Sequence, residues 1–144
     1  MVYTDGSCNG NPGPGGYAAI IKKGNRYYRE IVGKISSSSN NRMELIAVIK
    51  GLSGVRPNSK VIVYSDSQYI VAALNEGRLD EWKSNGWQRI RTGKPVKNRD
   101  LWEVLCKTIK QRNLEVSFQK IAAHKGNYFN ERVDFLARQA AKAA

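Results

Sequence analysis

The sequence predicts an α/β fold built on one mixed sheet. Its first part contains β-branched and aromatic runs separated by the turn residues Gly24-Asn25, which indicates antiparallel strands joined by a tight turn. The later part alternates short apolar strands with helical patterns, which favours parallel pairing and helices on both faces of the sheet. A chain of 144 residues is long enough for one core and short for two. We therefore expect a single domain over residues 1–144.

Three strands and a loop are expected in the first 40 residues. The runs at 1–4, 16–24 and 25–34 are rich in β-branched and aromatic side chains. A serine-rich segment at 36–40 then has the composition of a polar loop. These elements predict a sheet that begins with three antiparallel strands.

Helical periodicity begins after that loop. The segment Asn41–Glu44 has the form of a capping box, apolar residues follow it at spacing i, i+4 and i+7, and Arg56-Pro57-Asn58 ends the helix. Further on, "KVIVYS" predicts a strand, "DSQYIVAALNEG" a helix and "LEVSFQKIA" a last strand, with a last helix at 128–143. The expected order is βββαβα, a basic helical insert, and βα.

Charge and composition narrow the class of partner. The formal net charge is +12, and a globular chain this basic usually binds a polyanion, nucleic acid before an anionic membrane surface. Apolar runs such as Tyr69–Leu74 are far shorter than a membrane span, and no signal-peptide pattern opens the chain. Cys8 and Cys106 have no metal-type spacing and are expected to be reduced thiols. We expect a soluble, cytoplasmic protein.

Four carboxylates fall where strands end and helices begin. Asp5 follows the first apolar run, Glu44 lies in the first helical turn, Asp66 ends the fourth strand, and Asp134 lies near the start of the last helix. In an open α/β sheet these positions meet at the crevice where ligands bind. Each also has a structural alternative: an Asx turn, the capping box, a helix cap, and an i,i+4 pair with Arg138, respectively.

The four acids are harder to explain as a set. Clustered carboxylates repel one another and raise each other's pKa unless cations neutralise them. Mg²⁺ favours carboxylate and phosphate oxygens, and a pair of such ions can hold the attacking and leaving oxygens of a phosphoryl displacement. A basic protein with an acidic metal site is therefore expected to be a nuclease.

Five segments resemble the successive motifs of type 1 ribonuclease H in its bacterial single-domain form. They are "TDGSCNGNPGPGGY", "NNRMEL", "SDSQY", "KPVKNRDLW" and "AHKGNYFNERVDFLA", and they follow the family order over nearly the whole chain. The resemblance implies a ribonuclease H-like fold with a five-stranded mixed sheet. It also implies a monomeric endonuclease that hydrolyses the RNA strand of RNA–DNA hybrids with two Mg²⁺ ions, Mn²⁺ being an alternative, and leaves 5′-phosphate and 3′-hydroxyl ends.

The resemblance also implies roles for single residues. Asp5, Glu44, Asp66 and Asp134 match the metal-binding acids, and His124 matches a loop histidine that aids proton transfer or product departure. An imidazole has a suitable pKa for this work, although a single histidine is equally consistent with an ordinary surface residue. The chain departs from many bacterial members at Ala123 and at Tyr128-Phe129, which concerns the loop rather than the chemistry.

Substrate contacts are expected first from the glycine-rich segment after Asp5. An enzyme that recognises RNA in a hybrid must approach the 2′-hydroxyl in the minor groove, and glycines permit that approach. The resemblance, taken residue by residue, implies contacts with the groove and with a phosphate of the DNA strand. The groove contacts are Cys8, Asn9, Gly10, Asn11, Asn40, Glu44 and Gln68, and the phosphate contacts are Ser39 and Asn98. The alternative for the glycine-rich segment is a purely structural turn.

The basic insert is the second expected contact region. Residues 82–99 carry six cations and no acid, and within the family they correspond to a basic protrusion at about 79–99. Cations bind phosphates through counterion release, and indoles can pack on sugars. The expected contacts here are Trp82, Lys83, Trp87, Arg89, Arg91, Lys94 and Lys97. The alternatives are that the tryptophans are core residues and that the charges form a solvated face.

Two other functions compete with the nuclease hypothesis. A non-catalytic nucleic-acid-binding module would gain nothing from four acids facing phosphates. A metal-dependent enzyme acting on DNA would need no RNA-sensing segments like "NPGPGG" and "NNRMEL". An assay that maps which strand is cut, if any, distinguishes both from the nuclease hypothesis.

Overall fold

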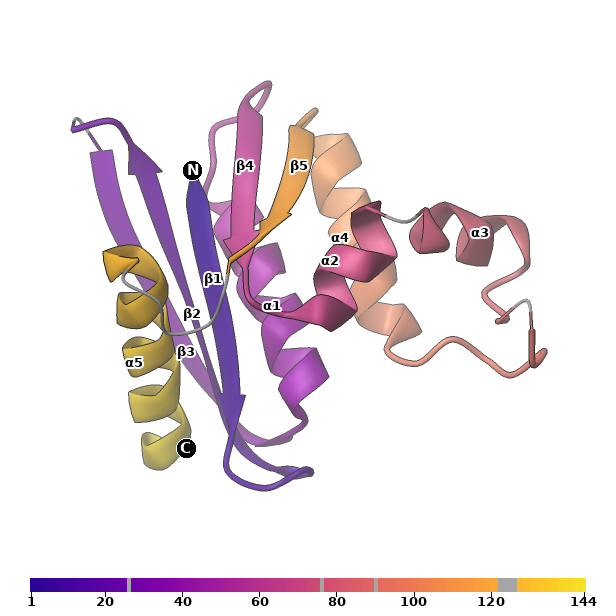
Figure 1. Cartoon of the computed structure of the whole chain (residues 1–144), viewed down its shortest axis with the longest axis horizontal. Helices are drawn as coiled ribbons and strands as arrows, with labels where there is room; N and C mark the ends of the chain where they lie inside the picture. The colour runs from indigo at the N-terminus through magenta and orange to yellow at the C-terminus, as the bar shows by residue number, and fades with distance from the viewer. Residues whose placement is uncertain (26, 76, 90, 122–126) are drawn as a thin grey trace.

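A five-stranded mixed sheet forms the centre of the molecule (Figure 1). The computed structural model describes residues 1–25, 27–75, 77–89, 91–121 and 127–144. The strands are β1 (Val2–Cys8), β2 (Gly13–Lys23), β3 (Tyr27–Ser38), β4 (Lys60–Ser65) and β5 (Glu115–Lys120). The helices are α1 (Asn40–Ser53), α2 (Gln68–Asn75), α3 (Arg78–Ser84), α4 (Arg99–Gln111) and α5 (Tyr128–Ala143).

The strand order is β3-β2-β1-β4-β5. The first three strands pair antiparallel, whereas β1 with β4 and β4 with β5 pair parallel. The predicted mixed sheet is therefore confirmed, with β1 at its centre. A central strand is covered on both faces, which explains the continuous burial of Val2–Asp5.

Helices cover both faces of the sheet, as predicted. In Figure 1, α5 packs against β1, β2 and β3 on one side, while α1 lies on the other side with α4 against it. Alternate side chains enter the two layers: Val2 joins the cluster under α1 and α4, and Tyr3 joins the cluster under α5. The sheet therefore has two separate apolar interfaces.

The strands extend further than the sequence pattern indicated. β1 continues through Asp5 to Cys8, so Asp5 lies within a strand rather than at its end, and β2 already begins at Gly13. Only the residues 9–12 form the turn between them. Likewise β3 runs to Ser38 and includes most of the loop expected at 36–40. Backbone pairing with neighbouring strands forms these segments, and their small and polar side chains carry no strand signal.

The helix boundaries also differ in two places. Ser39, not Asn41, is the N-cap of α1, because the Ser39 hydroxyl accepts a hydrogen bond from the Arg42 backbone N–H at 3.3 Å. The capping-box interpretation of Glu44 is therefore wrong. In addition, α4 is a separate helix that the prediction did not distinguish from the insert, although its buried Trp102 and Leu105 follow helical spacing.

The basic insert is helical only at its start. α3 ends at Ser84, and the following residues form turns closed by a bridge between Gln88 and Pro95. Figure 1 shows α3 and these turns projecting sideways from the sheet beyond α2. Among the described residues, no helix combines the length and the apolar character that crossing a bilayer requires.

Candidate active site

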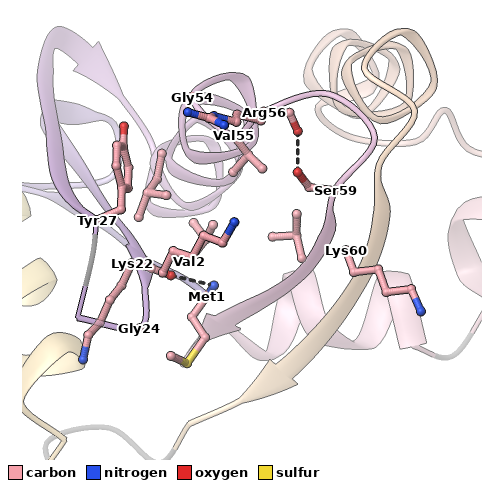
Figure 2. A pocket seen from close by; sticks show the side chains of 13 residues that line it. Met1, Val2, Lys22, Gly24, Tyr27, Gly54, Val55, Arg56, Ser59 and Lys60 are labelled. Carbon is pink, nitrogen blue, oxygen red and sulfur yellow. Dashed lines mark hydrogen bonds between the residues drawn. The ribbon is translucent and has the colours of Figure 1, made fainter.

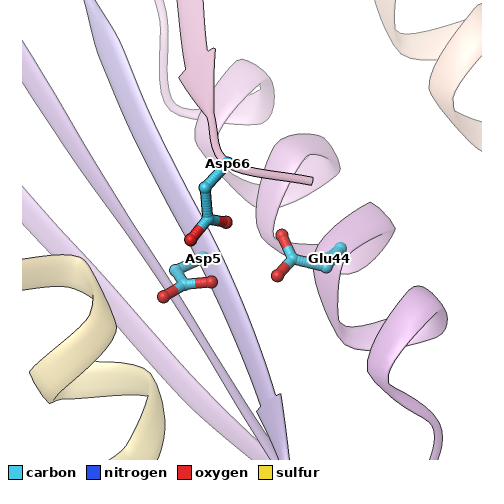
Figure 3. A group of neighbouring side chains, drawn as sticks. All are labelled: Asp5, Glu44 and Asp66. Atoms are coloured by element: carbon cyan, nitrogen blue, oxygen red, sulfur yellow. The ribbon is translucent and has the colours of Figure 1, made fainter. Parts of the chain in front are cut away.

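Three of the four predicted acids meet at the centre of the sheet. Asp5 comes from β1, Glu44 from α1 and Asp66 from the residue after β4, and each offers a carboxylate oxygen within 4.8 Å of the others (Figure 3). The three residues are far apart in the sequence. Their meeting is therefore a product of the fold, as the strand-end argument anticipated.

Two backbone features bring these carboxylates together. The parallel register pairs Tyr3 with Tyr64, so two residues further along, Asp66 comes beside Asp5. On the other side, Gly6 lets β1 approach α1 closely: a Cβ at that position would lie 2.5 Å from the Glu44 backbone nitrogen. Only glycine fits this contact, which sets Glu44 against the strand that carries Asp5.

The carboxylates lie in a buried environment. Asp5 is 4% exposed and Glu44 is 8% exposed. Burial, with smaller repulsion from Asp66 and Asp134, raises the pKa of Asp5 to about 7 against the lowering effect of its hydrogen bond with Glu44. Burial, and then the charge of Asp5, raises the pKa of Glu44 well above its ordinary value. Without a cation, the site therefore disfavours the ionised forms of its own acids.

Asp134 lies next to this cluster, but it is not one of the three acids whose oxygens lie within 4.8 Å of one another. It is in the second turn of α5, and its charge and side-chain hydrogen bond both raise the pKa of Asp5, so the two residues are neighbours. Its carboxylate also pairs with Arg138 at 2.8 Å, the i,i+4 contact that the sequence offered as an alternative. The i,i+4 interpretation therefore applies to Asp134, and its role as a metal ligand stays a prediction.

The remaining structural alternatives are weaker. Asp5 Oδ1 accepts a hydrogen bond from the adjacent Gly6 N–H at 2.9 Å, but Asp5 sits in a strand and opens no turn. At the start of α2, the Ser67 hydroxyl accepts from the Ile70 N–H at 3.4 Å, so Ser67 acts there as the cap beside Asp66. An Asx turn thus does not explain Asp5, and Ser67 supplies a capping hydrogen bond beside Asp66.

The donor set suits a hard divalent cation. Glu44 Oε2 is buried, and no hydrogen-bond partner for it exists among the described residues. A buried acceptor without a donor is unfavourable, and a bound cation would satisfy it. The cluster offers carboxylate oxygens alone, which are the ligands that Mg²⁺ prefers.

His124 lies outside the described residues, so its predicted role is untested. Asn127, the first described residue after this gap, is the N-cap of α5. Its Oδ1 accepts hydrogen bonds from the Phe129 and Asn130 N–H groups at 3.1 Å. Asn127 thereby fixes the start of the helix that carries Asp134.

The glycine-rich turn has one internal and one exposed part. The half-buried Cys8 thiol donates to the carbonyls of Gly13 at 3.1 Å and Ser38 at 3.2 Å, which supports the structural-turn alternative for that residue. Asn9, Gly10 and Asn11 are exposed. Asn11 Oδ1 accepts from the backbone N–H of Asn40 at 3.3 Å, so two predicted groove residues lie side by side.

The other predicted contacts lie at helix starts. Ser39 and Asn98 are the N-caps of α1 and α4, and Arg42 lies between them, donating from Nη1 to Asn98 Oδ1 at 3.3 Å. At the start of α2, Gln68 accepts a hydrogen bond from Lys120 at 2.8 Å. The sequence reasoning missed both Arg42 and Lys120, since neither contact leaves a local signal in the sequence.

The insert exposes most of its cations and packs its tryptophans against the core. Lys83, Arg91, Lys94 and Lys97 are exposed and Arg89 is half-buried. The half-buried Trp82 and Trp87 pack against the larger apolar core. The Trp82 ring meets Trp102 edge-on with centroids 5.5 Å apart, and the Arg99 guanidinium lies 5.6 Å from the Trp87 centroid. The core interpretation therefore applies to both indoles, and their contact with substrate stays a prediction.

A cavity of about 760 Å³ lies at the opposite end of the sheet (Figure 2). It is lined by the first residues of β1 and β4, the end of β2 and the end of α1, among them Val2, Lys22, Arg56 and Lys60. None of its lining residues is acidic. The cavity is therefore separate from the carboxylate cluster and offers no comparable metal ligands.

Comparisons with known proteins give one consistent family. The model of the family described as RNase H matches residues 1–142. "Ribonuclease H" of Prosthecochloris aestuarii is 45% identical over 142 residues, covering 99% of this chain and 94% of that protein. "Ribonuclease HI" of the Synechocystis strain is 45% identical over 136 residues, covering 94% and 83%.

Solved structures give the same answer for the fold. The crystal structure of LC9-RNase H1, described as a type 1 RNase H with the type 2 active-site motif, has a TM-score of 0.81 at 28% identity and covers 99% of this chain and 71% of its own. LC11-RNase H1, solved in complex with RNA/DNA hybrid, has a TM-score of 0.73 at 22% identity, covering 99% and 96%.

Proposed function

Because the chain belongs to the RNase H family, we propose that it is an endonuclease that hydrolyses the RNA strand of RNA–DNA hybrids, leaving 5′-phosphate and 3′-hydroxyl ends. The observation that carries this proposal is the convergence of Asp5, Glu44 and Asp66 from three distant segments onto one buried site. The relatives named ribonuclease H, at 40–46% identity over nearly the full chain, support the same activity.

We propose two Mg²⁺ ions as the cofactor, with Mn²⁺ as an alternative. Asp5, Glu44, Asp66 and Asp134 would hold them. When bound, such ions supply a water activated for attack and a Lewis acid for the phosphoryl oxygens. The chain's own contribution is preorganisation: the fold holds the buried Asp5 and Glu44 carboxylates together, and the unsatisfied Glu44 oxygen would gain a partner when the cation binds.

The proposed substrate contacts surround this cluster. Asn9, Gly10 and Asn11, together with Asn40 and Gln68, would reach the minor groove, where the 2′-hydroxyl distinguishes RNA from DNA. Ser39 and Asn98 would hold a phosphate of the DNA strand, and the cations of the insert at 79–99 would bind phosphates further along. His124 would assist proton transfer or product departure. Residues 1–144 would act as one catalytic domain, and the monomeric state and cytoplasmic location stay predictions.

One assay tests the activity and its substrate class. The protein is incubated with Mg²⁺ and four end-labelled substrates: an RNA–DNA hybrid, single-stranded RNA, duplex RNA and duplex DNA. Cleavage confined to the RNA strand of the hybrid, and abolished by EDTA, is the expected result. Cleavage of duplex DNA would favour the DNA-acting alternative, and binding of the hybrid without any cleavage would favour the non-catalytic module.

A further inference from the structure

Arg42 contacts both residues of the proposed phosphate pair. Its backbone N–H donates to the Ser39 hydroxyl at 3.3 Å, and its Nη1 donates to Asn98 Oδ1 at 3.3 Å. These two partners cap different helices, α1 and α4. We propose that Arg42 is a positioning residue that orients the Asn98 amide toward a phosphate of the DNA strand, an inference that rests on the proposed function.

The orientation of Asn98 is fixed from two sides. While Arg42 donates to its oxygen, its Nδ2 donates to the Tyr69 hydroxyl at 3.2 Å. That hydroxyl also accepts from Nε1 of the fully buried Trp102 at 3.0 Å, which anchors it to the core. Asn98 itself has a left-handed backbone with φ of 60° at the N-cap of α4. The amide is therefore held by its own backbone position and by both ends.

This orientation matters because an amide has two chemically opposite ends. The oxygen accepts hydrogen bonds and repels a phosphate, whereas the NH₂ group donates two. The bond to Tyr69 uses one of the two N–H groups of Asn98. With Arg42 holding the oxygen, the second N–H of Asn98 is the group that a phosphate would meet.

The positive charge of Arg42 is paired with Asp100. Its guanidinium forms a bidentate pair with Asp100, at 3.0 Å from Nη1 and 2.8 Å from Nη2. This fork explains why an arginine occupies the position: the planar group reaches Asp100 with two nitrogens and Asn98 with one of them, which a lysine ammonium cannot reproduce. The pair joins the first turn of α1, which continues to Glu44, to the first turn of α4. Arg42 thus acts on the phosphate through Asn98.

A double-mutant cycle tests this indirect action. Hybrid affinity is measured in the cleavage-deficient Asp66→Asn background with Mg²⁺ for four proteins: the parent, Arg42→Lys, Asn98→Ala, and both together. Arg42→Lys should weaken binding about tenfold or more, the effect of one lost charge-assisted hydrogen bond. If Arg42 acts through Asn98, the double variant should bind no more weakly than Asn98→Ala alone.

Controls separate positioning from charge and from stability. Lys60→Ala removes one cation from an exposed pair with Glu115 at the far end of β4, and it should leave hybrid affinity unchanged. In the cleavage-competent protein, Arg42→Lys should raise KM and leave kcat similar. Asp100→Asn, which keeps both residues but weakens the fork that holds the Arg42 guanidinium, should also weaken hybrid binding, and it provides a second variant if Arg42→Lys melts at assay temperature.

A modified substrate identifies the phosphate. A single neutral methylphosphonate is moved along the DNA strand until it weakens binding by the parent, and at that position Arg42→Lys should show little further loss. Additive losses in the cycle, or equal sensitivity of parent and variant to the methylphosphonate, would overturn the positioning role. An Asn98→Ala protein with parental affinity would refute the phosphate pair itself, while leaving the strand-cleavage assay as the separate test of activity.

Discussion

The carboxylate cluster and the basic insert place opposite charges in opposite environments. Asp5 and Glu44 are almost fully buried on the central strand and on α1. The insert cations such as Arg91 and Lys94 are exposed on turns that project beyond α2. Metal ligands must be held to within a fraction of an ångström, so they need the packed core, whereas phosphate attraction acts over several ångströms and tolerates an exposed segment.

The two regions also differ in what they cost the fold. Burial raises the pKa of Asp5 to about 7, so ionising it at neutral pH destabilises the metal-free protein. The exposed cations carry little desolvation penalty, and the half-buried Trp82 and Trp87 fasten their segment to the core. Catalytic and binding functions should therefore fail separately, and in different assays.

The largest expected effect is the loss of cleavage at the cluster. Asp66→Asn should lower kcat at least about 10³-fold, since the electrostatic contribution of a bound metal is several kcal/mol. Hybrid binding should persist, because the insert and the exposed turn are unchanged. Parallel cleavage and binding measurements at saturating Mg²⁺ check this, and near-parental cleavage would remove Asp66 from the metal ligands.

The next largest effect concerns binding by the insert. Alanine at Lys83, Arg89, Arg91 and Lys94 should raise KM and leave kcat similar. Each lost phosphate contact removes about 0.9 from the slope of log K against log salt, so four contacts flatten it by up to about 3.6. Affinity measured between 50 and 200 mM salt in the Asp66→Asn background would then vary about 10²-fold less. Parallel salt plots of equal affinity would assign the cations to a solvated face.

The smallest expected effect is on stability and its pH dependence. The folded protein keeps a proton on Asp5 up to pH about 7, against an ordinary pKa of 3.8, so the stability that Asp5 contributes to the metal-free protein is fully present below pH 4 and is lost as pH rises through 7. In EDTA, Asp5→Asn should flatten the fall in Tm between pH 5 and 8 and melt higher than the parent at pH 8. Each 1 kcal/mol corresponds to roughly 4 °C in a domain of this size.

Addition of Mg²⁺ and a control variant of the insert complete this measurement of Tm. Mg²⁺ should raise the Tm of the parent at pH 8 by mass action and have a much smaller effect on Asp5→Asn. The fourfold alanine variant of the insert should keep the parental pH profile, since it leaves the buried acids untouched. An Asp5→Asn protein with the same metal response as the parent would place the metal elsewhere.

The sequence predicted which acids lie together better than it predicted the secondary structure around each of them. Strand-end logic brought Asp5, Glu44 and Asp66 together correctly, because alternating strands and helices leave few topologies. It misplaced Asp5 at the end of a strand, since the segment through Cys8 is recruited by pairing with β2 and has no β-branched signal of its own. It also assigned a capping box to Glu44, because Asn41 and Ser39 are both good caps and only the tertiary structure selects Ser39.

Long-range polar contacts were beyond such reasoning. Arg42 and Asp100 are separated by 58 positions, and their pairing depends on how α4 docks against α1. No periodicity encodes that docking. For the same reason, the sequence could not decide whether the tryptophans of the insert pack in the core or contact the substrate. Composition shows only that aromatic rings lie beside cations. The packing against Trp102 shows which side the Trp82 ring faces.

The close approach at Gly6 constrains how this enzyme can be altered. Glycine-to-alanine exchange is a common route to a more stable protein, because it reduces the conformational entropy of the unfolded chain. Here the added methyl would meet the backbone of Met43 and Glu44 at 2.5 Å and push α1 away from β1. An evolving or engineered lineage could therefore vary the exposed insert without disturbing the carboxylate cluster, whereas a larger residue at position 6 of β1 would need a matching change in α1.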